Sequence, residues 1–88
     1  MARDALEEEV LAIDWMIAAE PGWKALFHDL DGDEVGRSRV IGWGSVRRGN
    51  STKVVGIIVD PNDPTQLIPA TEATDPYGGE FSRYGFAP

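Results

Sequence analysis

Cysteine is absent from this chain of 88 residues, histidine occurs once, and lysine occurs only at Lys24 and Lys53. Without cysteine there is no disulfide framework and no thiolate zinc site, which fits a reducing cytoplasm. No apolar run approaches the roughly 20 residues that a membrane-spanning helix needs. The first residues are acidic and mixed, unlike a secretory signal. We therefore expect a cytoplasmic protein without membrane contact.

Motifs that carry catalysis are also missing. The single histidine, His28, neighbours Asp29, but neighbours in a strand point to opposite faces. No nucleophile elbow, phosphate-binding loop or HExxH zinc motif occurs. We expect no enzyme, no cofactor, and no catalytic or metal-binding residue.

Positive charge is scarce and confined to one segment. The net charge is −7, yet residues 35–60 carry five basic side chains against Asp60 alone. The overall acidity argues against nonspecific binding of nucleic acid, because the protein as a whole repels phosphate. The basic segment keeps that option open.

The clearest pattern in the chain is a long β-hairpin from Arg39 to Asp60. Two runs rich in β-branched residues, 40–46 and 54–59, flank a Gly49-Asn50 turn. A loop of two or of four residues gives the same register, with Arg39 opposite Asp60 and Trp43 opposite Gly56. The indole of Trp43 can then lie across Gly56. The alternate glycines Gly42 and Gly44 leave a smooth track for another segment or for a ligand.

The segment from Asp4 to Ala19 has the pattern of an amphipathic helix. Asp4 and Glu7 have the spacing of a capping box. One apolar stripe follows helical spacing, and it consists of Leu6, Val10, Ile13 and Ile17. A second stripe, with Leu11 and Trp15, lies well round the helix. Three alternatives are open for the second stripe: the C-terminal segment covers it, a partner buries it, or it stays exposed.

The remaining chain predicts short strands and turns. We expect a strand over 23–28, a bulge near Gly36, a short strand over 66–68 ended by Pro69, one helical turn over 71–73, and an edge strand over 81–86. The prediction is a single α+β domain over residues 1–88. A helix (1–20) packs on an antiparallel meander of four or five strands, which can curl into a small SH3-like barrel. Residues 23–60 form a three-stranded core, and 61–88 are rich in loops.

Four carboxylates lie within the six residues Asp29 to Glu34. Calcium takes six to eight oxygen ligands, so this segment resembles a cation site. Its glycine precedes the third acidic position, whereas the EF-hand loop places glycine after it. Asp31-Gly32 is also a common hairpin-turn dipeptide. We interpret the segment as a solvated turn.

Arginine outnumbers lysine, and Ala, Gly, Asp and Trp are frequent. Together with the runs Ile13-Asp14-Trp15-Met16-Ile17 and Ile41-Gly42-Trp43-Gly44, the chain resembles small uncharacterised proteins of high-GC actinobacteria and their phages. The resemblance covers the whole chain and implies no activity and no site residues.

These observations favour a small non-enzymatic protein-interaction module or homo-oligomer. Leu11 and Trp15 would form the partner-binding surface, because Trp, Tyr and Arg dominate interface energetics. The alternative is binding of nucleic acid or another acidic ligand at the hairpin tip, through Arg47, Arg48 and Lys53. In that case Trp43 and Tyr84 would supply stacking surfaces.

Overall fold

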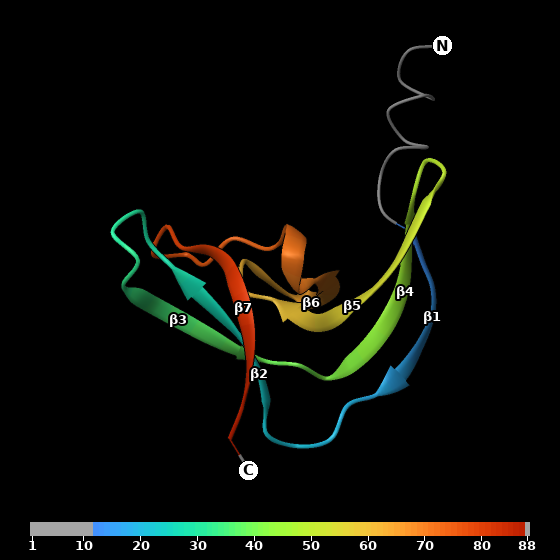
Figure 1. Ribbon diagram of the computed structural model, residues 1–88, viewed down its shortest axis with the longest axis horizontal. Helices are drawn as coiled ribbons and strands as arrows, with labels where there is room; N and C mark the ends of the chain where they lie inside the picture. The colour runs from blue at the N-terminus through green and yellow to red at the C-terminus, as the bar shows by residue number, and fades with distance from the viewer. Residues whose placement is uncertain (1–11, 88) are drawn as a thin grey trace.

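The computed structural model describes residues 12–87, and two antiparallel sheets make up most of that part (Figure 1). One sheet has four strands in the order β1-β4-β5-β6, and the other has three in the order β3-β2-β7. The elements are β1 (Ala12–Ala18), β2 (Trp23–His28), β3 (Glu34–Arg39), β4 (Gly42–Arg48), β5 (Ser51–Asp60), β6 (Asp63–Pro69), the 3-10 helix η1 (Ala70–Glu72) and β7 (Glu80–Phe86). The two sheets do not close into a barrel.

The predicted N-terminal helix is wrong for the part of it that the structure describes. Residues Ala12–Ala18 form strand β1, which pairs antiparallel with β4, and residues 4–11 lie outside the described range. Helical spacing and strand alternation coincide here, because Ile13, Trp15 and Ile17 also alternate with other residues. Ile and Trp favour strands, and β4 offers backbone partners that a helix would leave unused. The expected α+β class is therefore wrong, and the described residues form an almost all-β fold.

The predicted hairpin is confirmed at its tip. Gly42 pairs with Ile57, Trp43 with Gly56, and Arg48 with Ser51, which leaves a two-residue loop. Gly49 has a φ of 59° and Asn50 does not have a positive φ. This is the pattern of a type II′ turn, whose twist suits a hairpin.

The hairpin prediction fails at its base, because the first strand of the predicted hairpin, which was expected to begin at Arg39, divides between the two sheets. Arg39 ends β3 and pairs with Lys24, so it does not face Asp60. The Val40 N–H donates to the Trp23 carbonyl oxygen at 2.9 Å. The next residue, Ile41, donates to the Ile57 carbonyl oxygen at 2.9 Å. The chain therefore passes from one sheet to the other at Val40 and Ile41.

The other predicted elements are largely confirmed. Strand β2 has the predicted bounds, and β7 lies at the edge of its sheet as expected. The bulge falls at Val35, beside Gly36, because Phe27 pairs with Gly36 and His28 with Glu34. The helical turn is η1, which begins one residue earlier than predicted.

The main core lies between the two sheets. Its buried members are Ala25, Phe27, Val40, Ile58, Ala70 and Ala73. Aromatic rings surround it in edge-on or tilted contacts, an arrangement that the charge distribution of the rings favours. The Trp43 ring lies 5.1 Å from that of Tyr84 and 5.5 Å from that of Trp23. A second small cluster, of Val46, Val55 and Ile57, lies on the other face of the four-stranded sheet.

Candidate functional sites on the two faces of the hairpin sheet

Apolar side chains remain exposed on one face of the four-stranded sheet. Trp15 pairs with Ser45, which in turn pairs with Val54, so these three residues form one row across three strands. The neighbouring row begins with Ile17, opposite Trp43. The exposed fractions are 50% for Trp15, 59% for Ile17 and 60% for Val54. We call Trp15, Ile17 and Val54 the Trp15 face.

A shallow cavity of about 450 Å³ continues the Trp15 face toward the other sheet. Its lining is mostly apolar and consists of Ile17, Ala18, Glu20, Trp23, Trp43 and Phe86. The Trp23 ring contacts those of Trp43 and Phe86, with centroid distances of 5.5 and 5.0 Å. The cavity and the face share Ile17, so they form one apolar surface.

Strand β1 also lies at the edge of its sheet, and its outer edge has no partner strand within residues 12–87. Ile13 and Met16 are exposed as well, so apolar groups remain uncovered along this strand. Neither lysine nor proline, which often protect an edge, occurs in β1. Its one charged residue, Asp14, lies at a register shift and 3.4 Å from Arg47.

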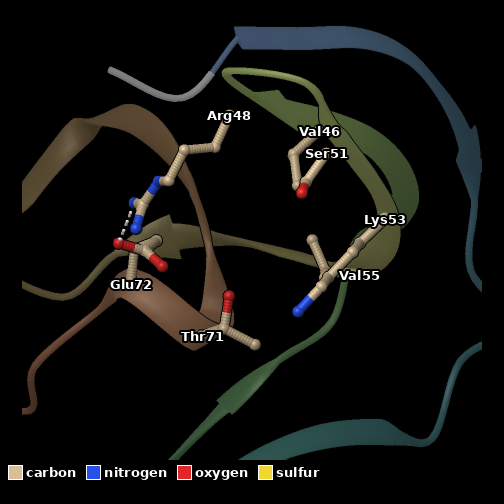
Figure 2. Close-up of a pocket in the computed structure, with 7 residues that line it drawn as sticks. All are labelled: Val46, Arg48, Ser51, Lys53, Val55, Thr71 and Glu72. Carbon is tan, nitrogen blue, oxygen red and sulfur yellow. Dashed lines mark hydrogen bonds and ion pairs between the residues drawn. The ribbon is translucent and has the colours of Figure 1, made fainter. Parts of the chain in front are cut away.

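The opposite face of the same hairpin forms a pocket of about 310 Å³ (Figure 2). Alternation along β4 and β5 directs their contributing residues to that face. We call it the hairpin pocket, and its lining residues are Val46, Arg48, Ser51, Lys53, Val55, Thr71 and Glu72. The last two come from η1 and so from a segment far along the chain.

Of the two cationic side chains in the hairpin pocket, Arg48 has a carboxylate partner and Lys53 has none among the described residues. The Arg48 Nη2 donates a 2.6 Å hydrogen bond to Glu72 Oε1, and both side chains are exposed enough to be hydrated. Lys53 has no ion-pair partner within residues 12–87. In Figure 2 its side chain extends toward the part of the pocket where Thr71 lies. The walls therefore carry one unmatched positive charge above the apolar residues Val46 and Val55.

The structure separates the predicted basic residues. Arg48 and Lys53 line the same pocket, whereas Arg47 belongs to the other face and contacts Asp14. Trp15 is half-exposed, as a partner-binding residue must be, and Leu11 lies outside the described residues.

Sequence reasoning missed Ile17, Val54 and Glu72. The helix prediction placed Ile17 on the first apolar stripe, away from Leu11 and Trp15. Glu72 lies 24 positions from Arg48, and no local spacing connects two such residues. For Val54, the strand alternation on β5 was the available signal.

The acidic segment from Asp29 to Glu34 is a turn held by its own first carboxylate. Asp29 Oδ1 accepts hydrogen bonds from the backbone N–H groups of Asp31 (2.9 Å) and Asp33 (3.0 Å). Gly32 has a φ of 86°, which a glycine adopts without strain. Across residues 12–87, no three His, Cys, Asp or Glu side chains gather in a way that could hold a metal ion.

No family model, curated protein or solved structure matches this chain. The resemblance to small actinobacterial and phage proteins stays a prediction. Among the helices of the described part, none has the length and apolar character to cross a membrane.

Proposed function

We propose that this protein is a non-enzymatic protein-interaction domain, which binds its partner through the Trp15 face. The observation that carries the proposal is the exposure of Trp15, Ile17 and Val54 on one face of the sheet, beside an apolar cavity. Single exposed apolar residues are ordinary, whereas apolar patches larger than about a few hundred Å² mark interaction surfaces. Burying such area stabilises a complex by about 25 cal/mol per Å² before the costs of association are subtracted.

The unpaired edge of β1 adds backbone groups to this surface. A partner strand laid along β1 would gain main-chain hydrogen bonds, while its side chains meet the Trp15 face. Either a second copy of this chain or a different protein can supply such a strand. The homo-oligomer is therefore one form of the same proposal.

The alternative of nucleic-acid binding has less support. Arg47 and Arg48 lie on opposite faces, and each contacts a carboxylate, Asp14 and Glu72 respectively. The three predicted basic residues therefore do not share one face, and the net charge of −7 opposes a polyanion.

The test begins with sedimentation velocity of the whole chain over a wide concentration range. If the chain self-associates, Trp15→Ala should weaken association by at least about 2 kcal/mol, as for an interface anchor. The same change should cost about 1 kcal/mol or less in unfolding free energy, because Trp15 is half-exposed. Leu67→Ala is the matched control, since Leu67 is exposed at the opposite edge of the sheet.

If the chain is monomeric, a photo-crosslinking amino acid replaces Trp15 or, as the control, Leu67. The chain is then irradiated in an extract of its source cells. The proposal expects a discrete crosslinked protein from position 15 and none from position 67. Equal crosslinking at both positions, or an equal loss of association and folding in Trp15→Ala, would contradict it.

A further inference from the structure

We propose that the hairpin pocket binds a small monocarboxylate with an apolar body. This site is independent of the protein-interaction proposal, because it lies on the opposite face of the sheet from Trp15. Four observations carry it: the volume, the apolar floor, a cation without an ion-pair partner in the described residues, and the hydroxyl groups on the walls.

The pocket has the size and composition of a small-molecule site. Its volume of about 310 Å³ lies at the lower end of the range for ligand pockets, about 300–1,000 Å³. The floor consists of Val46 and Val55, which are almost fully buried and belong to the second core cluster. An apolar ligand body can therefore contact a fixed surface, because these side chains are held in that cluster.

The charges of the pocket select a monoanion. Arg48 is already neutralised by Glu72, so among residues 12–87 Lys53 is the pocket cation that a ligand can match. A carboxylate supplies one negative charge and accepts charge-assisted hydrogen bonds from an ammonium. A phosphate dianion would leave one negative charge unmatched, close to the Glu72 carboxylate. The hydroxyls of Ser51 and Thr71 can donate to the ligand oxygens.

The Arg48–Glu72 pair connects the hairpin tip to η1 and spans one side of the pocket (Figure 2). Exposed ion pairs contribute only about 0–1 kcal/mol, so this one can open without unfolding the sheet. When the Arg48–Glu72 pair opens, a ligand can enter the hairpin pocket from that side. Arg48 keeps its own partner when the ligand is bound, and Lys53 carries the recognition.

The whole protein also limits the ligand to a small one. A chain of net charge −7 repels polyanions, but that repulsion is screened beyond about 10 Å at 0.1 M salt. A single carboxylate beside Lys53 experiences mainly the local cation. The same argument disfavours a nucleic acid in this pocket.

The experiment uses the full chain with ¹³C-labelled lysine, which gives signals from Lys24 and Lys53 alone. The probe is 4-phenylbutyrate, and the matched neutral probe is 4-phenylbutanol. We expect a saturable shift of the Lys53 Cε signal with the acid and none at Lys24, which lies in β2 of the other sheet. The acid should bind roughly tenfold more tightly than the alcohol, the effect of one charge-assisted contact.

Three variants complete the test. Lys53→Met keeps the apolar stem without the charge, and it should lose roughly tenfold in affinity for the acid and little for the alcohol. Lys53→Arg should retain most of the binding, and Lys24→Met should bind like the unchanged chain. Amide NMR spectra, which should match the unchanged chain, verify the fold of each variant.

Several results would overturn the proposal. These are shifts that do not saturate, equal shifts at both lysines, or unchanged acid affinity in Lys53→Met. Inorganic phosphate that shifts Lys53 as strongly as 4-phenylbutyrate would overturn the monocarboxylate assignment. Trp15→Ala should bind the acid normally, so failure of one proposal leaves the other standing.

Discussion

The backbone N–H of Gly56 in β5 donates a 2.7 Å hydrogen bond to the hydroxyl oxygen of Tyr84 in β7. This bond joins the two sheets across the main core. A Cβ atom at position 56 would lie 2.6 Å from Cε1 of Tyr84, closer than real Cβ atoms approach. Tyr84, rather than the predicted Trp43, therefore covers Gly56, and Trp43 packs against the edge of the tyrosine ring.

Gly56→Ala should destabilise the fold by about 1–3 kcal/mol, because the added methyl group displaces Tyr84. The measurement is urea unfolding followed by tryptophan fluorescence. Gly85→Ala is the control, since its Cβ would meet Leu26 at 3.4 Å, an ordinary contact. Equal midpoints for the two variants would mean that Tyr84 does not pack on Gly56.

Tyr84 should make stability depend on alkaline pH. Burial raises the pKa of Tyr84 above the ordinary value of 10.0, and the hydrogen bond from Gly56 lowers it by less. A raised pKa in the folded state means that the unfolded chain loses its proton first. The stabilising contribution is then complete below pH 10 and is lost as the pH rises through the folded pKa. Unfolding free energy should fall above pH 10, and it should fall less steeply in Tyr84→Phe.

The pKa itself is measured by absorbance of the phenolate at high pH. Tyr77→Phe leaves Tyr84 as the one tyrosine of the chain, so the titration reports that group alone. A midpoint at or below pH 10 in the folded protein would contradict the assigned direction.

Phe27→Ala should cost about 3–5 kcal/mol, the usual effect of deleting a large buried ring. Phe27 is fully buried, and its ring lies 6.3 Å from that of Phe81 in an edge-on contact. Leu30→Ala, at a fully exposed side chain, should change stability by less than about 0.5 kcal/mol. Thermal unfolding of both variants is the measurement. Comparable losses of stability in the two variants would mean that Phe27 does not belong to the core.

The Arg48–Glu72 ion pair should contribute little to stability. A double-mutant cycle with Arg48→Gln and Glu72→Gln should give a coupling energy below about 1 kcal/mol, and less at high salt. The measurement is urea unfolding at low and at high salt. A coupling energy of several kcal/mol would mean that the pair is a fixed structural contact, and ligand entry to the hairpin pocket would then need another route.

Local patterns predicted the strands better than their arrangement. Gly49-Asn50 sets a tight turn, so the register from Gly42 to Ile57 followed from the sequence. The division of the long strand did not, because the run of β-branched residues continues through Val40 and Ile41. What divides it is the pairing of Val40 with Trp23, a contact between residues distant in the chain.

The contrast between local patterns and contacts of distant residues also explains which candidate-site residues the sequence could predict. Arg48 and Lys53 were predicted together because they flank one turn. Their companion Glu72 arrives through η1, which no local pattern places beside the hairpin. Trp15 was chosen because it lay on the second stripe of an expected helix and because Trp is common at interfaces, but the described part of that helix is strand β1. The sequence left open whether Trp15 would be covered or exposed, because neighbouring strands and not residue type decide which side chains of a short apolar segment stay at the surface.

The pairing of Trp23 with Phe86 has a consequence for the order of assembly. The β4–β5 hairpin closes over a loop of two residues, whereas β2 and β7 must close over the 51 residues 29–79, which is a slow step in folding. Until β7 arrives, one edge of β2 stays open beside Phe27. Such an edge is a template for pairing with other chains. The rate at which the C-terminal strand docks therefore sets how long a nascent or refolding chain is prone to aggregate.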